Sequence, residues 1–385
     1  MSKRTMTDIF ISSDNILSPI GLSTAVNFER LKQDISGIKK QDNKRMSEQP
    51  FYAALFENDF SGNDLPDSFT KFEKLLIASV DDALSKTEIR ATDKKTVFII
   101  STTKGNISLL ETEKPSKELN ERISLNTSAK LVADHFGFIN RPVIISNACI
   151  SGMLAILTGM GLIQSGQYDH AVVTGADVIS KFILSGFQSF QAISPSVCKP
   201  FDAARDGINL GEGAGTVILT SNKEYSSGIK VTGGSVSNDA NHISGPSRTG
   251  EELNIAINKA MSMAGVSADD IGFISAHGTA TVFNDEMEAK AINLAGLQFA
   301  PVNSLKGYYG HTLGAAGLIE SIISIQSLKD NTVIPTPGFE NMGVTQPVNV
   351  CTTVIQTPLQ HCLKTASGFG GCNAALVFSK QQNQQ

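Results

Sequence analysis

The stretch "SNACISGMLAILTGMGLIQSG", residues 146–166, decides the fold. From Ile150 onward it predicts a helix that is apolar on nearly every face, and such a helix is buried between layers. The strand-like runs "RPVIIS" (141–146) and "DHAVVTGAD" (169–177) flank it. Strand, helix and strand in this order are typical of a parallel sheet with a right-handed crossover. A helix that is apolar all round then requires sheet on both of its sides.

Further elements of the same kind occur along the chain. Strands are predicted at 7–13 and 95–101, helices at 21–33 and 69–86, and a polar surface loop at 39–49. A second series follows, with helices at 250–265, 284–296 and 314–331, strands at 271–279 and 300–304, and a strand–turn–strand at 363–380. Because both series repeat strand, polar turn and helix, we expect two similar halves, 1–245 and 246–385, divided near "NHISGPSRTG" (241–250).

Composition excludes several classes of function. The chain has 385 residues, of which 41% are hydrophobic, so a large core is expected. Its formal net charge is −5 and its basic residues form no stripe, so nucleic acid is not an expected partner. No apolar run reaches the roughly 18 residues that span a bilayer, and the start lacks the apolar segment of a signal peptide. We therefore expect a cytoplasmic protein with no membrane partner.

One of the five cysteines, Cys149, is a candidate nucleophile. The five cysteines form no CxxC pair and are odd in number, which argues against a disulfide framework and against a zinc site. Cys149 follows a strand and precedes the apolar helix, where helix N–H groups stabilise a thiolate. A buried structural cysteine is the alternative, and the position of Cys149 at a strand end, where α/β sheets bind ligands, counts against it.

Two stretches of the second half place histidines in similar positions. In "AHGTATVFNDEMEA" (276–289), His277 ends a strand, where a base or hydrogen-bond donor can meet a bound carbonyl. Asp285 and Glu288 begin the next helix, and taken singly their role is to complement its dipole. In "KGYYGHTLGAAGLIES" (306–321), Lys306 precedes His311 on a turn into a Gly/Ala-rich helix.

Lys306 is predicted to point inward. It lies between an apolar strand and a tightly packed helix, so it needs a carboxylate partner, and Glu288 or Glu320 can serve.

Two glycine-rich stretches complete the pattern. In "GFGGCNAALVF" (368–378), glycines surround Phe369 ahead of a strand, and such a loop can aim backbone N–H groups at an oxyanion. An ordinary β-turn is the alternative. The stretch "PFDAARDGINLGEGAG" (200–215) gathers acidic and basic residues around glycines, which predicts a structural ion-pair and turn element at the mouth of a site.

These motifs together resemble the elongating β-ketoacyl-[acyl-carrier-protein] synthases. The resemblance spans essentially the whole chain and rests on five motifs in the family's order: "NACISG", "PFDAARDGINLGEGAG", "AHGTATVFNDEMEA", "KGYYGHTLGAAGLIES" and "GFGGCNAALVF". It implies the thiolase fold, an α/β five-layered α-β-α-β-α sandwich of two duplicated halves that is normally dimeric. It also implies acyl carrier protein as partner, either a homodimer or a heterodimer with a ketosynthase homologue, and no metal or organic cofactor.

The resemblance assigns roles residue by residue. Cys149 resembles the nucleophile that carries the acyl chain as a thioester, and His277 and His311 resemble the pair that promotes decarboxylation of the malonyl thioester. Lys306 resembles the cation that fixes the histidines, with Glu288, and also Asp285 and Glu320, in support. The N–H groups of Cys149 and Phe369 would form the oxyanion hole, and the Phe369 ring resembles the family's gate to the acyl pocket.

Departures from the family's pattern suggest a specialised enzyme. Ser367 stands where the family usually has Phe, and Cys372 where it has Thr. The segment 105–136 is shorter than in typical fatty-acid enzymes, and "SKFILSGFQSFQAIS" (180–194) is less glycine-rich than expected for the mobile loop near the gate. These departures favour a synthase of an aryl-polyene, flexirubin-like or other type II polyketide pathway over housekeeping fatty-acid synthesis.

Four other kinds of protein are alternatives to an elongating synthase. A chain-length-factor partner would lack the nucleophile, whereas Cys149, His277, Lys306 and His311 are all present. An initiating synthase resembles a Cys-His-Asn arrangement that the His311 motif does not fit. A degradative thiolase uses a second cysteine near the C-terminus, but the loop around Cys372 matches the synthase motif. The fourth alternative, a malonyl decarboxylase that does not condense, is not excluded by the sequence.

Overall fold

The computed structural model describes residues 7–57, 60, 65–240 and 245–381. In this part of the chain, eleven strands form one hydrogen-bonded sheet in the order β13-β11-β10-β15-β16-β9-β1-β8-β6-β4-β5. Its strands are β1 (Phe10–Leu17), β4 (Thr96–Ser101), β5 (Val143–Ile145), β6 (His170–Asp177), β8 (Gly213–Thr220), β9 (Ile229–Asn238), β10 (Ile271–Ser275), β11 (Pro301–Asn303), β13 (Asn349–Val350), β15 (His361–Gly368) and β16 (Cys372–Lys380).

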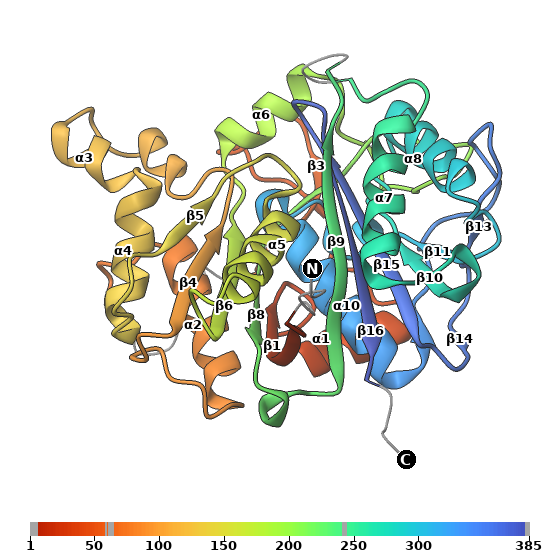
Figure 1. Cartoon of the computed structure of the whole chain (residues 1–385). Helices are drawn as coiled ribbons and strands as arrows, with labels where there is room; N and C mark the ends of the chain where they lie inside the picture. Colours follow the sequence, from red (N-terminus) through yellow and green to blue (C-terminus); the bar gives the residue numbers. More distant parts are fainter. Residues whose placement is uncertain (1–6, 58–59, 61–64, 241–244, 382–385) are drawn as a thin grey trace.

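Smaller sheets and the helices complete the described chain (Figure 1). The short strands are β2 (Lys39–Gln41), β3 (Phe51–Ala54), β7 (Leu210–Gly211), β12 (Thr332–Val333) and β14 (Ile355–Gln356). The α-helices are α1 (Thr24–Lys32), α2 (Lys71–Ser85), α3 (Lys117–Arg122), α4 (Leu125–Phe136), α5 (Ser151–Gln164), α6 (Lys181–Ser189), α7 (Glu251–Ala264), α8 (Val282–Leu294), α9 (Lys306–Tyr309) and α10 (Ala316–Asp330). Short 3-10 helices lie at Ile107–Glu111, Lys223–Tyr225, Ala268–Asp270 and Leu313–Ala315.

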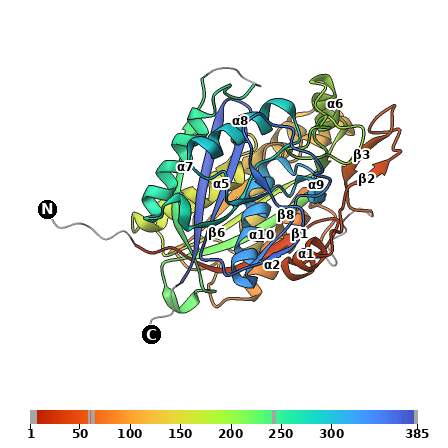
Figure 2. The same ribbon diagram turned by 90° about the vertical axis from the view of Figure 1, so that its right-hand side faces the viewer.

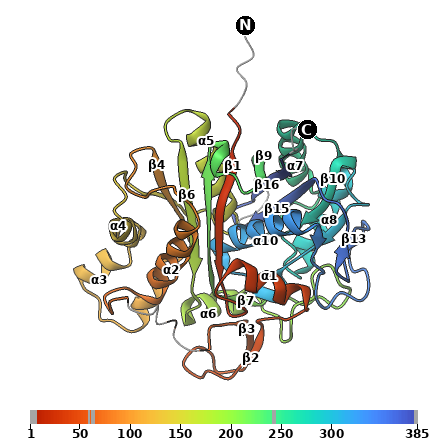
Figure 3. The same ribbon diagram turned by 90° about the horizontal axis from the view of Figure 1, so that it is seen from below.

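The elements stack in five layers. Helix α2 packs on β1, β6 and β8, and α7 packs on β9 and β16, so each half of the sheet has its own outer helices. Figure 3 shows α2 and α4 at one side of the molecule and α7 and α8 at the other. Helices α5 and α10 lie between, in contact with strands of both halves. The predicted α-β-α-β-α sandwich, with the apolar helix in its middle layer, is confirmed.

Three hydrophobic clusters fill the spaces between these layers. One joins α2 to the sheet, with Leu76 and Phe98 fully buried. A second joins α7 to the other half of the sheet. The largest surrounds the two central helices and includes Ile156, Leu318 and Ile322. Helix α5 is apolar on nearly every face because it packs against sheet on both sides.

The predicted strand–helix–strand unit is confirmed as parallel. Strand β4 lies between β5 and β6 and pairs with both in parallel, with Ile100 opposite Ile144 on one side and Thr174 on the other. Strands β10 and β15 form the corresponding parallel pair in the second half. Parallel strands end at one edge, so the turns after β4, β5 and β6 lie together in the first half and the turns after β10, β11 and β15 lie together in the second.

Central helices α5 and α10 approach each other at two glycines. A Cβ atom on Gly152 would lie 2.5 Å from the Leu318 backbone nitrogen, and one on Gly317 would lie 2.8 Å from Met153 Cγ. Real Cβ contacts are not this short, so a side chain at either position would push the helices apart. This contact sets the distance between the chain segments that lead into the two helices.

Three segments differ from or add to the expectations. The segment 39–49, predicted to be a loop, contains strand β2. This strand pairs antiparallel with β3, and the two lie at the side of the molecule (Figure 2). Segment 105–136 forms a 3-10 helix, α3 and α4, and the segment 180–194 forms α6. Residues 241–244 of the expected boundary lie outside the described residues, and the division into 1–245 and 246–385 stays a prediction.

Within the described residues, no helix combines the length and apolar character needed to cross a membrane.

We expect Gly152→Ala to destabilise the protein by about 1–3 kcal/mol, because the new methyl group collides with the backbone of α10. The matched control is Gly161→Ala in the same helix, where an added Cβ meets no atom within 4 Å. That substitution should leave stability unchanged or raise it by up to about 1 kcal/mol. Urea unfolding of both variants is the measurement, and equal effects on the two midpoints would contradict this packing account.

Candidate active site

Cys149 lies on a sharp turn between β5 and α5. The preceding residue, Ala148, has φ of 43°, in the left-handed region that non-glycine residues seldom adopt. The Ser151 hydroxyl holds the turn, since it accepts the Asn147 N–H at 2.8 Å and donates to the Ala148 carbonyl at 2.7 Å. The turn presents the cysteine side chain to a cavity, as the sequence predicts.

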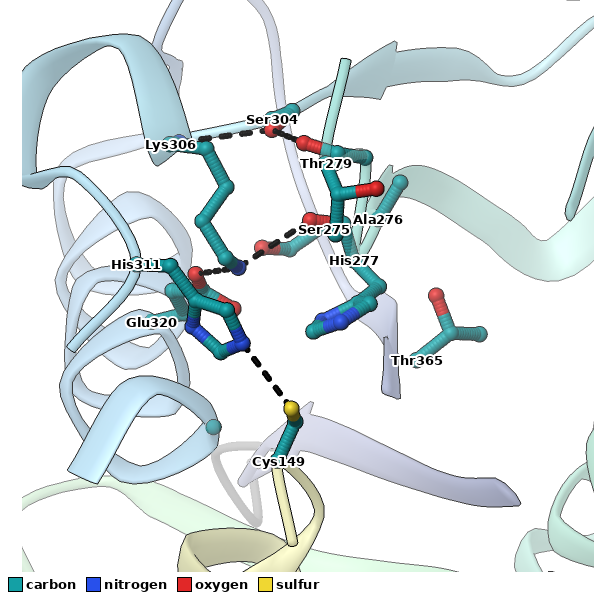
Figure 4. A network of polar contacts seen from close by, with 12 residues as sticks. Cys149, Ser275, Ala276, His277, Thr279, Ser304, Lys306, His311, Glu320 and Thr365 are labelled. Carbon is teal, nitrogen blue, oxygen red and sulfur yellow. Dashed lines mark hydrogen bonds and ion pairs between the residues drawn. The ribbon is translucent and has the colours of Figure 1, made fainter. Parts of the chain in front are cut away.

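The thiol of Cys149 lies beside the imidazole of His311. Its Sγ lies 2.9 Å from His311 Nε2, and Figure 4 shows the two side chains pointing at each other. Burial raises the pKa of the Cys149 thiol to about 12, while Lys306 and the N–H of Phe369 lower it. Burial therefore favours the thiol over the thiolate, against the stabilisation of a thiolate that is expected at a helix N-terminus.

His277 and His311 face each other beside the cysteine. Their ring centroids lie 5.3 Å apart in an edge-on arrangement, and both side chains are buried. Burial, together with the ammonium group of Lys306, holds the pKa of each imidazole well below its usual value of 6.5. Both are neutral at physiological pH, so each carries one N–H donor.

Lys306 occupies the position that the sequence predicts. Its side chain is fully buried, and its Nζ forms an ion pair with Glu320 and donates to the His277 carbonyl at 3.0 Å. Of the two carboxylates that the sequence offered as partners, Glu320 is the one that pairs with Lys306. Figure 4 shows this pair next to the two histidines.

Glu288 and Asp285 hold the histidine loop. Glu288 accepts the backbone N–H groups of His277 and Gly278, each at 2.8 Å, and the Thr365 hydroxyl at 2.6 Å. Asp285 accepts the Thr279 N–H at 2.9 Å. The expected role of complementing the dipole of α8 is thus replaced by a more specific one, because both carboxylates reach back and satisfy the loop that carries His277.

The cavity in front of Cys149 is about 490 Å³ in volume and is lined by both histidines, Cys149 and Phe369. The Phe369 ring is 41% exposed and stacks on Phe187 from α6, with a centroid distance of 6.1 Å. Phe190 meets it edge-on at 5.7 Å. Phe369 therefore lies at an aromatic entrance, with its N–H directed at the cysteine sulfur.

The stretch 200–215 is only partly the ion-pair element expected from the sequence. Asp206 lines the cavity and accepts a hydrogen bond from Ser194 at 2.6 Å. Glu212 pairs with Lys71 of α2 rather than within the stretch, at 2.8 Å. Arg205 donates to backbone carbonyls, including that of Gly343.

Two buried charged residues near the site, Lys364 and Asp177, were not predicted from the sequence. Lys364 on β15 is fully buried and forms an ion pair with Glu320 at 2.7 Å. Asp177 at the end of β6 accepts the Gly314 N–H at 2.7 Å, and burial raises its pKa to about 6. A charged residue within an otherwise small and apolar strand, as in "HCLKTASG" (361–368), was the available signal for Lys364.

Ligand atoms of Cys149, His277 and His311 lie within 4.8 Å of one another, a spacing that a metal ion could use. The buried ammonium groups of Lys306 and Lys364 disfavour a further cation there.

Comparisons with known proteins agree with this site. Models of the N-terminal and C-terminal domains of beta-ketoacyl synthase match residues 7–225 and 229–340. The chain therefore belongs to the beta-ketoacyl synthase family.

Individual relatives span the chain from end to end. The 3-oxoacyl-[acyl-carrier-protein] synthase 2 of Vibrio cholerae is 29% identical over 424 residues, which cover 99% of this chain and 100% of the relative. Among solved structures, the ketosynthase ApeO in complex with its chain length factor ApeC from Xenorhabdus doucetiae has a TM-score of 0.86 at 25% identity, covering 97% and 98% of the two chains. The ishigamide ketosynthase/chain length factor has a TM-score of 0.89 at 24% identity, covering 98% and 100%, and it supports the fold.

Burial of the histidines predicts a pH-dependent stability. An imidazole whose pKa is lowered in the folded state binds its proton more readily when unfolded, so its contribution to stability is lost as pH falls below 6.5. Compared with the unaltered protein, His311→Asn should gain relative stability between about pH 7.5 and about pH 5.5, by up to about 1.4 kcal/mol per pH unit.

Differential scanning fluorimetry across this pH range measures the difference between variant and unaltered protein. Taking the difference removes the opposite contribution of buried carboxyl groups such as Asp177. His135→Asn, on the exposed face of α4, is the control and should show a constant difference. A constant difference for His311→Asn as well would refute the neutral, buried imidazole.

Proposed function

We propose that this protein catalyses a decarboxylative Claisen condensation. An acyl chain passes from acyl carrier protein to Cys149 as a thioester, and a malonyl unit on acyl carrier protein then extends it. The products are 3-oxoacyl carrier protein and CO2. The observation that supports this most directly is the 2.9 Å contact between Cys149 Sγ and His311 Nε2, with His277 facing His311 in the same cavity. The proposal invokes no metal or organic cofactor.

Acyl transfer comes first. Cys149 Sγ attacks the thioester carbonyl, the bond between that carbonyl and the carrier sulfur breaks, and the carrier leaves as a thiol. The proton of Cys149 passes to the leaving sulfur, so His311 stays neutral and keeps its N–H. The N–H of Phe369, which is directed at the sulfur, and that of Cys149 itself are the donors proposed for the developing oxyanion.

Decarboxylation follows when malonyl carrier protein binds. The bond to the carboxylate carbon breaks, CO2 leaves, and the electron pair forms an enolate on the thioester. Neutral His277 and His311 each donate one N–H to the enolate oxygen, and the nearby ammonium group of Lys306 adds positive potential. Because neither imidazole has to be deprotonated, these donors are ready before the charge develops.

Condensation completes the cycle. The enolate carbon attacks the Cys149 thioester, a carbon–carbon bond forms, and the tetrahedral intermediate collapses with loss of the cysteine sulfur. That sulfur takes up one proton from solvent to restore the thiol. A thiol suits both roles, since it is a good nucleophile and a good leaving group.

The partners follow from the same proposal. The Vibrio cholerae relative is named for an acyl-carrier-protein substrate, and solved relatives are ketosynthases with chain length factors. We therefore propose that a carrier protein docks at the cavity mouth and that the chain pairs with a second copy or a homologue. A cytoplasmic location is proposed as well, and the five free cysteines fit a reducing compartment.

The alternative is a non-elongating homologue that acts as partner subunit or only decarboxylates malonyl carrier protein. The complete nucleophile site favours condensation, because a decarboxylase has no need of a cysteine aimed at His311. The presence or absence of a covalent acyl adduct distinguishes the two.

We expect the unaltered protein to gain one acyl group from acyl carrier protein and Cys149→Ala to gain none, because Cys149 carries the thiol that lies 2.9 Å from His311 Nε2. Cys149→Ala should still release CO2 from malonyl carrier protein, since both imidazoles remain. Intact-protein mass spectrometry and CO2 release measure the two steps. Cys198→Ala, which removes a buried thiol outside the cavity lining, is the control. An adduct that persists on the Cys149→Ala variant would disprove the assignment.

A further inference from the structure

Lys364 is a second buried cation of the site, and the mechanism above does not use it. It lies on β15 opposite Ser275 of β10, and its side chain has no exposed surface. Its Nζ donates to the carbonyls of Ser275 and Ala276, each at 3.1 Å, and to that of Thr365 at 2.8 Å. It also pairs with Glu320 at 2.7 Å.

Lys364 and Lys306 act on one short piece of backbone. Lys306 Nζ donates to the His277 carbonyl, so the two ammonium groups together hold three consecutive carbonyls, 275 to 277. One carboxylate of α10, Glu320, bridges them with its two oxygens. Figure 4 shows the Lys306 side of this arrangement, with Ser275, Ala276 and His277 in sequence.

The burial of two ammonium groups in this arrangement costs free energy. Burying an ammonium group is unfavourable, and the Lys306–Glu320 pair is already neutral without Lys364. Burial lowers the pKa of Lys364, and Glu320 and, more weakly, Glu288 oppose this by raising it. Glu288 lies on the other side of the same loop and accepts the His277 N–H. Four charged groups thus enclose the backbone of His277 and leave its side chain free to face His311.

We propose that Lys364 is a positioning residue for His277. Through the carbonyls of Ser275 and Ala276, and through Glu320 to Lys306, it fixes the imidazole where the enolate forms and adds positive potential there. This inference rests on the proposed condensation.

The role of Lys364 predicts which step depends on it. Its contacts all lie on the β10 and α10 side of the site, whereas Cys149 belongs to the turn after β5. Acylation of Cys149 should therefore be independent of Lys364, and decarboxylation with condensation should depend on it. Both imidazoles also have a pKa lowered in part by Lys364, in agreement with its electrostatic reach.

The test uses Lys364→Met, which keeps the length of the side chain and removes its charge and donors. We expect kcat for condensation to fall at least about tenfold, as when one preorganised donor to a developing charge is lost. The KM for malonyl carrier protein and the rate of Cys149 self-acylation should stay within about twofold of the unaltered enzyme, since the cavity and nucleophile are unchanged. Lys364→Gln, which keeps an N–H donor, is a second variant should the methionine variant not fold, and its kcat should fall as well.

Lys380→Met is the matched control. Lys380 ends the neighbouring strand β16, and its Nζ donates to Asn331, away from the cavity. This variant should condense at the unaltered rate. A parallel fall of self-acylation and kcat in Lys364→Met would indicate general structural damage and overturn the proposed role, as would an unchanged kcat.

The same experiment separates this inference from the proposed function. If the unaltered enzyme neither acylates Cys149 nor releases CO2 from malonyl carrier protein, the condensation itself is wrong and the inference falls with it. If the unaltered enzyme does both and Lys364→Met does both equally fast, only the role of Lys364 is wrong.

Discussion

The close approach of α5 and α10 is the constraint on which the rest of the structure depends. At Gly152 and Gly317 the two helices meet with no room for a side chain. Helix α5 begins just after Cys149, and α10 follows the turn that carries His311, so the contact between the helices also fixes the 2.9 Å contact between sulfur and imidazole. Packing in the middle layer therefore determines the geometry of the site.

Electrostatics at the site follow from the same burial. Burial in the middle layer favours the neutral forms of the Cys149 thiol and of both imidazoles. Charge is supplied instead by ammonium groups held by carboxylates, with Glu320 between Lys306 and Lys364. A neutral donor pair next to fixed positive charge suits a reaction in which negative charge appears on a substrate oxygen and then disappears.

Much of this could be predicted from the sequence. The all-apolar helix after Cys149 predicted sheet on both of its sides, because its composition is a local signal. The five layers, and the convergence of Cys149, His277, Lys306 and His311, followed from the resemblance of the motifs to the synthase family. Lys364 was missed although its strand carries the signal of a charge among small and apolar residues, since a lysine in a strand is ordinarily exposed. The partner of Lys306, the loop-holding role of Glu288 and the protonated state of Cys149 all depend on distances and burial that only the folded chain defines.

The central claim is that two neutral imidazoles are held ready beside Cys149. Nitrogen NMR of the protein with labelled histidines, recorded across a pH titration, tests it most directly. His277 and His311, assigned by single substitution, should keep the chemical shifts of neutral imidazole at pH values well below the usual histidine pKa of 6.5. Titration of either ring near 6.5 would contradict it.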